Sequence, residues 1–111
     1  MKITDIVKDY SYGSASSDRG LETAILVEAA DLGIEWADTE MMAIRSNRRD
    51  RSDKTAKKRL KNHIKSNLDI ETPYGVLFTT VILPFIINAI VNYVVRKIIE
   101  LMFKEMNNPT G

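Results

Sequence analysis

The sequence predicts a mostly α-helical protein: a small helical head, a basic amphipathic helix and a long hydrophobic helix. Three observations support this prediction. Apolar residues recur at helical spacing, charge is segregated into three unlike regions, and the 24 residues from Thr72 to Val95 carry no charge. The 111 residues suffice for one domain. Along the chain we expect an acidic head (1–45), a basic linker and amphipathic helix (46–71), a long hydrophobic helix (72–106) and a tail (107–111).

The head is acidic, because residues 1–43 hold nine acidic and three basic side chains, a net charge of −6. Its opening, MKITDIVKDY, has the spacing of a short amphipathic helix, with an apolar side made of Ile3, Ile6, Val7 and Tyr10. The following SYGSASSDRG is rich in Ser and Gly and is predicted to be a loop.

The rest of the head predicts two further helices. One starts near Asp18 or Gly20 and runs through LETAILVEAADL to Gly33, a common stop signal. The other runs through EMMAIR, with Asp38 or Thr39 as its cap. The single tryptophan, Trp36, is expected to anchor the core of the head.

Residues 44–66 form the basic region, with ten basic and two acidic side chains and a net charge of +8. A helix is predicted from Asp53 to about Asn67, because Ala56, Leu60 and Ile64 recur every four residues as a narrow apolar stripe. The candidate lipid- or phosphate-binding residues of this region are Arg48, Arg49, Arg51, Lys54, Lys57, Lys58, Lys61 and Lys65.

This basic helix has three interpretations from sequence. It contacts anionic headgroups or an acidic protein, it binds nucleic-acid phosphates without reading bases, or it has no partner and is either a solvated face or neutralised by the acidic head. No aromatic side chain is interleaved with the basic residues, so a stacking platform for single strands is not predicted.

The uncharged run predicts a helix that is long enough to cross a membrane. Thr72 and Pro73 have the pattern of an N-cap followed by a first helical residue, and only Pro84 interrupts the helix before Met106. A hydrocarbon core of ~30 Å needs about 20 residues, and we expect a span at about 74–95. The residues expected at the membrane interface are Tyr74, Tyr93, Arg96 and Lys97.

A row of less apolar residues follows one side of this helix at a spacing of four: Thr80, Pro84, Asn88 and Asn92. Such a row in a mostly Ile, Val, Leu and Phe surface is typical of a helix that meets a partner helix on one side. We therefore expect these four residues at a helix–helix contact. The alternatives are the lining of a small pore and a helix buried inside a soluble oligomer.

The distribution of basic residues also predicts an orientation. More lysines precede the expected span than follow it, which places the N-terminal domain on the cytoplasmic or interior side of a membrane.

The sequence carries no constellation typical of catalysis. It has no cysteine, no carboxylate cluster at metal-ligand spacing and no phosphate-binding loop. The single histidine, His63, is expected at a surface or edge of the basic helix. We therefore expect no catalytic residue, no metal and no cofactor.

The function expected from sequence is a non-enzymatic, single-span, membrane-anchored component of a larger assembly, such as a virion or an envelope complex. Its partners would be membrane lipid, other proteins or further copies of itself, with non-specific nucleic acid as another candidate. The alternatives are a soluble oligomeric virion or nucleic-acid-associated protein and a small membrane-permeabilising protein.

Overall fold

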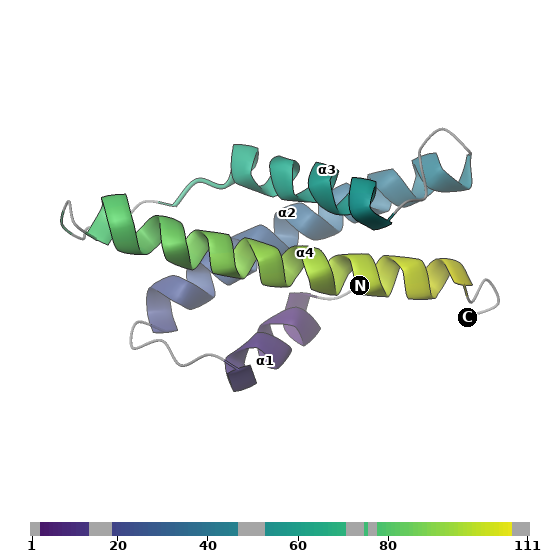
Figure 1. Ribbon diagram of the computed structural model, residues 1–111. Coiled ribbons are helices and arrows are strands. Elements are labelled where there is room, and N and C mark those ends of the chain that lie inside the picture. Colours follow the sequence, from purple (N-terminus) through teal and green to yellow (C-terminus); the bar gives the residue numbers. More distant parts are fainter. Residues whose placement is uncertain (1–2, 14–18, 47–52, 71–74, 76–77, 108–111) are drawn as a thin grey trace.

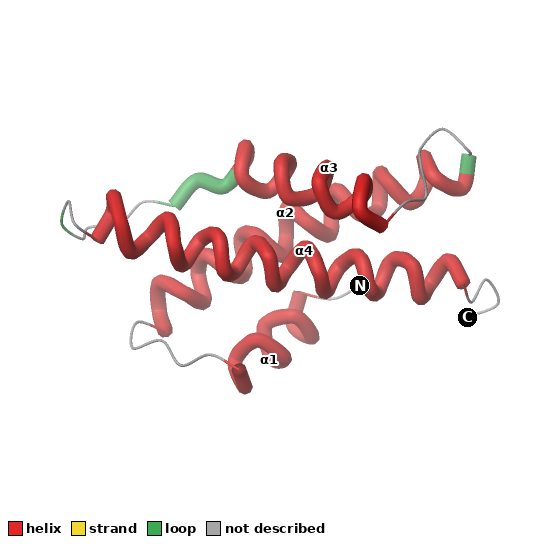
Figure 2. Tube along the Cα trace, in the orientation of Figure 1, coloured by secondary structure: helices red, strands yellow, loops and turns green. Residues whose placement is uncertain are grey.

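The fold is a bundle of four α-helices in the part of the chain that the computed structural model describes, residues 3–13, 19–46, 53–70, 75 and 78–107 (Figure 1). The helices are α1 (Ile3–Gly13), α2 (Arg19–Arg45), α3 (Asp53–Asn67) and α4 (Leu83–Asn107), and a π-helical turn, Phe78–Ile82, precedes α4. The described ranges contain no β-strand (Figure 2). The expected mostly α fold with a long apolar C-terminal helix is confirmed.

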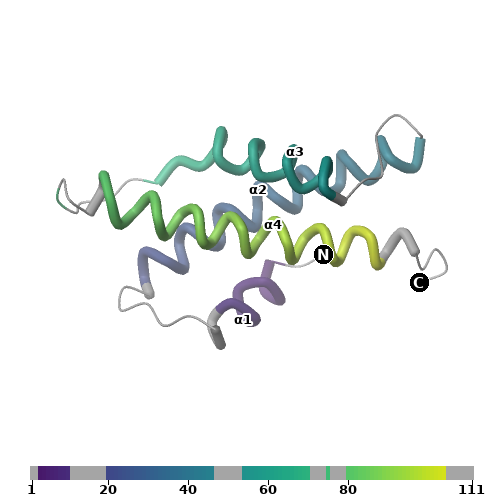
Figure 3. Tube along the Cα trace, in the orientation of Figure 1, coloured from purple at the N-terminus to yellow at the C-terminus, as the bar shows by residue number. Residues whose placement is uncertain are grey.

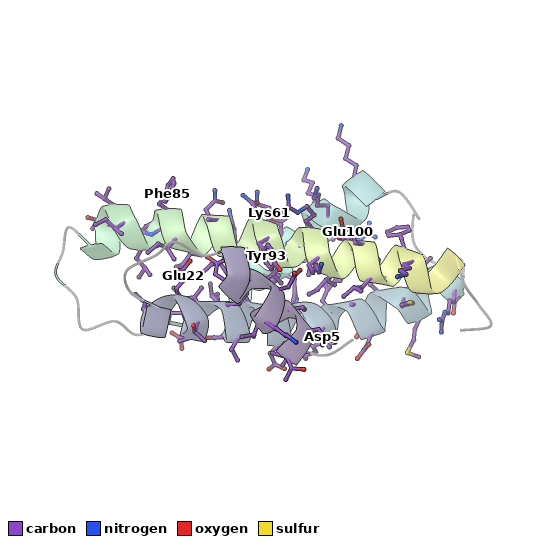
Figure 4. All side chains as sticks on the ribbon, turned by 90° about the horizontal axis from the view of Figure 1, so that it is seen from below. Asp5, Glu22, Lys61, Phe85, Tyr93 and Glu100 are labelled. Carbon is purple, nitrogen blue, oxygen red and sulfur yellow. The ribbon has the colours of Figure 1, made fainter. Side chains whose placement is uncertain are left out.

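The longest helix, α2, supports the other three. Figure 1 shows α4 crossing in front of α2, with α3 above α4 and α1 below it, and the tube in Figure 3 follows the same path. Seen from below in Figure 4, α2 and α4 form the two sides of the bundle, with α1 between them. One side of α4 therefore faces away from the rest of the protein.

A single hydrophobic core joins the four helices. The inward side of α4 supplies much of it, because Ile90, Val91, Val94, Ile98 and Met102 are all fully buried. Burying a side chain of this size contributes roughly 1.5–3 kcal/mol each relative to exposure. The predicted head and the predicted hydrophobic helix therefore share one core and pack along their lengths.

The two predicted amphipathic helices, α1 and α3, are confirmed. In α1, Ile6 is fully buried, and Ile3, Val7 and Tyr10 pack against the same cluster. The helix continues through Gly13, so the first residues of the stretch predicted as a loop are helical. In α3, the bounds agree with the prediction, and the stripe of Ala56, Leu60 and Ile64 has no exposed area.

One boundary prediction is wrong, because α2 continues through Gly33 to Arg45 as a single helix of 27 residues. A Cβ atom at Gly33 would overlap Ile98 Cδ1 and would lie 3.4 Å from Val94 Cγ1 and 3.6 Å from Ile64 Cδ1. Gly33 therefore allows three helices to approach one another closely. Its role is packing and not helix termination. Trp36, expected to anchor the head, is only partly buried against the common core.

The start of α4 also differs from the expected continuous helix. The α-helical geometry begins at Leu83, directly after the π-helical turn. Pro84 has no N–H with which to continue an α-helical ladder, and the change from π-helical to α-helical geometry lies directly before it. The expected Thr72–Pro73 start lies outside the described residues.

The contact at Gly33 yields a test of the packing. Gly33→Val should lower the free energy of unfolding by about 1–3 kcal/mol, because its methyl groups would overlap Ile98 and Val94. Chemical denaturation followed by circular dichroism measures this change. A Cβ atom at Gly75 would meet nothing within 4 Å beyond its chain neighbours, so Gly75→Val is the control and should have little effect.

Combining Gly33→Val with Ile98→Ala should recover part of the loss, because the smaller side chain makes room at the contact. Strictly additive losses in the double variant would contradict a direct contact between the two positions.

Candidate functional site: the seam between α3 and α4

Basic side chains of α3 and polar side chains of α4 lie along one seam between these helices. At one end, Lys65 Nζ donates a hydrogen bond of 3.1 Å to Asn88 Oδ1. At the other end, Lys57 and Arg96 line the same pocket. The two helices are antiparallel (Figure 1), and both pairs fit one register in which each step of four residues on α3 matches a step of four on α4. This register places Lys61 opposite Asn92.

The seam thus brings together two groups of residues that sequence patterns singled out separately. Lys57, Lys61 and Lys65 come from the basic set, and Asn88 and Asn92 come from the polar row. All are exposed apart from Lys61, which is half-buried. The lysines on α3 and the polar residues on α4 both recur every four residues. Once the two helices are packed antiparallel in this register, each lysine therefore lies opposite a polar residue of α4.

An exposed apolar surface adjoins the Lys65 end of the seam, where α4 begins. Phe85 is 77% exposed, Val81 58% and Ile82 43%. In Figure 4 the side chains of Phe85 and Lys61 point to the same side of the bundle. We call Lys57, Lys61, Lys65, Asn88, Asn92, Arg96, Val81, Ile82 and Phe85 the seam surface.

The orientation of α3 is fixed from its inner side. Arg59 forms an ion pair with Glu40 of α2, whose side chain is almost fully buried. Beyond the helix end, the backbone N–H of Asp69 donates a 3.0 Å hydrogen bond to Glu28 Oε1, also on α2. With its apolar stripe and Arg59 turned inward, α3 presents its remaining basic side chains to solvent.

A separate polar cluster holds α1 against α4. Asp9 Oδ2 accepts a 2.9 Å hydrogen bond from the Tyr93 hydroxyl and lies 2.6 Å from Lys97 Nζ. The rings of Tyr10 and Tyr93 meet edge to face with centroids 5.1 Å apart, and the Tyr10 hydroxyl donates to Glu22 on α2. These contacts lie on the α1 side of α4, away from the seam.

The other predicted site residues are placed as follows. Lys54 and Lys58 are exposed on α3, and Thr80 and Pro84 are exposed around the start of α4. Tyr93 and Lys97, expected at a membrane interface, contact α1. His63 is half-buried, and its Nε2 atom has no hydrogen-bond partner among the described residues. Arg48, Arg49, Arg51 and Tyr74 lie outside the described residues.

Sequence reasoning missed two features of this region. It treated the apolar residues at the start of α4 as part of a uniform span and did not separate them from the residues that enter the core. It also found no pocket at the Lys57 end of the seam, because the pocket combines residues of two helices. The four-residue spacing shared by both helices was the signal available for the seam itself.

The cluster around Asp9 predicts a pH dependence. The hydrogen bonds from Lys97 and then from Tyr93 hold the pKa of the Asp9 carboxyl below its ordinary value. A carboxyl whose pKa is lowered on folding stabilises the folded state above its unfolded pKa of about 4, and this contribution is lost as the pH falls through the folded pKa. Hydrogen exchange of the α1 amides should therefore accelerate more below pH 4 than that of the central α2 amides, beyond the intrinsic pH effect.

The matched variant is Asp9→Asn. It should accelerate α1 exchange at pH 7 and remove the additional acid dependence. Unchanged α1 protection in Asp9→Asn would show that the cluster does not hold α1 in place.

The seam surface can bind anions and apolar groups side by side, since cations and amides lie next to exposed apolar side chains. The described residues contain no group of three or more His, Cys, Asp or Glu side chains that could hold a metal ion. One helix in the described ranges, Thr80–Lys104, is long and apolar enough to cross a membrane, judged by length and composition. Comparison with protein-family models, with curated proteins and with solved structures found no match.

Proposed function

We propose that this protein is a non-enzymatic, membrane-associated component of a larger assembly and that it docks on anionic bilayers through the seam surface. The observation that carries the proposal is the position of Phe85, 77% exposed, on the same side of the bundle as Lys61 of α3. Apolar side chains beside a row of cations are typical of proteins that bind at the headgroup layer.

Both parts of the surface contribute to binding. Apolar area removed from water contributes about 25 cal/mol per Å², and Phe85, Val81 and Ile82 supply such area at the start of α4. Each Lys or Arg close to an anionic surface contributes about 1 kcal/mol, and this share falls with added salt. Since anionic lipids are abundant in the cytoplasmic leaflet, we propose that the protein docks from the cytoplasmic or interior side.

Docking suits the packed bundle better than a span does. If α4 crossed a bilayer with its neighbours attached, the lysines of α3 and the acids of α2 beside it would enter the hydrocarbon region. Each charge near the bilayer centre costs roughly 2.5–3.5 kcal/mol on insertion scales. A transmembrane α4 therefore requires that it separate from α2 and α3, with loss of the contacts of Ile90, Val94 and Ile98. We propose the docked bundle as the membrane-bound form, and the anchored single span as the alternative.

A second candidate function rests on the same exposed row. Asn88 and Asn92 lie on the outward side of α4 together with Phe85, so this side is also suited to a contact between copies of the protein. The protein would then be an oligomeric assembly component without a lipid partner. Nucleic acid is the other anionic partner that the lysines of α3 could bind.

Vesicle flotation tests the docking proposal. Wild-type protein should float with vesicles that contain phosphatidylserine and not with pure phosphatidylcholine vesicles. Changing Lys61 and Lys65 together to Gln should weaken this binding about thirtyfold at low salt, since each lysine contributes on the order of 1 kcal/mol. Equal binding of wild type and variant to the anionic vesicles would refute the role of the seam.

Phe85 and Met42 provide a matched pair for the apolar contribution, because both are largely exposed, at 77% and 71%, and Met42 lies on α2 outside the seam surface. Phe85→Ser should reduce vesicle binding severalfold, whereas Met42→Ser should leave it unchanged. Alkaline carbonate extraction then separates the two membrane-bound forms: a docked bundle is released, and a protein whose α4 spans the bilayer stays in the pellet.

The oligomer candidate predicts a different result. Changing Asn88 and Asn92 to Leu should reduce chemical crosslinking between copies if these amides join two α4 helices. Sedimentation of the wild type as a monomer, with or without lipid, would contradict that candidate.

A further inference from the structure

A pocket of about 400 Å³ lies at the Lys57 end of the seam, between the first turns of α3 and the second half of α4. The described residues that line it are Lys57 from α3 and Arg96, Ile99, Glu100 and Phe103 from α4. This volume lies within the range of roughly 300–1,000 Å³ that is usual for small-molecule sites. The pocket is a partly open hollow between two helices, whereas the side chains around Phe85 stand out on the surface.

The lining of the pocket has an apolar part and a charged part. Ile99 is almost fully buried and Phe103 is partly buried, so these two residues form an apolar floor. Lys57, Arg96 and Glu100 are exposed and form a charged rim. Among the described lining residues, two cations and one carboxylate give the rim a net positive charge, with the cations contributed by different helices.

This division matches a molecule with one anionic head and an apolar chain. Arg96 can bind phosphate or carboxylate oxygens through two parallel hydrogen bonds, and Lys57 adds a mobile positive charge. Ile99 and Phe103 provide contacts for the first carbons of the chain. An inorganic anion would use the rim alone and leave the floor in contact with water.

The pocket also fits the geometry of docking. Arg96 follows Phe85 by eleven residues on α4, which places the two roughly 17 Å apart along the helix axis. With α4 parallel to the bilayer plane, Phe85 would enter the headgroup layer at one end while the pocket meets a headgroup at the other.

We propose that this pocket binds one anionic phospholipid, with the phosphate between Lys57 and Arg96 and the start of an acyl chain on Ile99 and Phe103. The proposal rests on the proposed membrane docking, and it adds a specific lipid site to a general surface attraction. Glu100 disfavours ligands with more negative charge, because its carboxylate repels additional negative charge at the rim.

A soluble lipid tests the site without a bilayer. Dihexanoyl phosphatidic acid, kept below its micelle concentration, is titrated into ¹⁵N-labelled full-length protein and followed by NMR. Saturable binding with the largest amide shifts at Ile99, Glu100 and Phe103 is the expected result. Dihexanoyl phosphatidylcholine, whose head carries no net charge, and inorganic phosphate, which has no chain, should each bind at least about tenfold more weakly.

The charged residues of the rim are exposed, so each can be replaced without disturbing the core and compared with a control substitution. Arg96→Gln should weaken binding of the short-chain phosphatidic acid about tenfold, as expected for the loss of charge-assisted hydrogen bonds. Lys57→Gln should also weaken it, whereas Lys58→Gln removes the same charge from the neighbouring position outside the pocket lining and should have little effect. Glu100→Gln should tighten binding. Unchanged chemical shifts elsewhere in the spectra establish that each variant is folded.

The two proposals fail in different ways. Inorganic phosphate binding as tightly as the lipid, equal losses in Lys57→Gln and Lys58→Gln, or shifts that map away from the pocket would each overturn the lipid site. Vesicle flotation of the Phe85→Ser variant and of the Lys61→Gln, Lys65→Gln double variant reports on docking separately, because these residues lie outside the pocket lining. If flotation still depends on Phe85 and Lys65 while the short-chain lipid does not bind at the pocket, docking stands and the specific site is wrong.

Discussion

Burial of the inward side of α4 is the interaction on which the rest of the structure depends. Val94 and Ile98 meet α2 at Gly33, where the absence of a side chain lets the two helices approach, and Ile64 brings α3 to the same point. An exposed helix with this many β-branched residues would have little stability of its own. Its packing partners differ in charge, because six acidic and two basic residues lie on α2, whereas six basic residues and one acidic residue lie on α3.

This packing gives the two halves of α4 different environments. In the second half, the bundle covers the inward side chains, such as Ile90, Val94 and Met102. Near the start, Val81, Ile82 and Phe85 remain in contact with solvent. The uncharged run that suggests a membrane span is thus partly a core element and partly a surface element. Hydropathy alone averages over both and does not separate them, since the same side chains suit lipid and a protein interior equally well.

Much of the fold follows from sequence, and the exceptions have clear physical causes. The apolar stripe of α3 and the amphipathic pattern of α1 predicted their helices, because local spacing alone determines which side is apolar. Gly33 was misjudged because its role depends on Ile98, 65 residues away in the chain. The contacts of Tyr93 and Lys97 with Asp9 also join distant segments. The seam could be predicted only in part. The row of lysines on α3 and the row of polar residues on α4 were both visible in the sequence, but their alignment depends on the antiparallel packing of the two helices.

The segregation of charge between α2 and α3 has a further consequence. Six acidic and two basic residues lie on α2, while six basic residues and one acidic residue lie on α3, so the molecule carries a permanent electric dipole despite its formal net charge of only +1. A uniform electric field exerts torque on such a molecule even when it exerts little net force. Near an anionic partner, within a Debye length of about 8–10 Å, rotation would turn the basic helix towards that partner before contact is made. Orientation during encounter would thus be governed by how the charges are arranged and not by their sum.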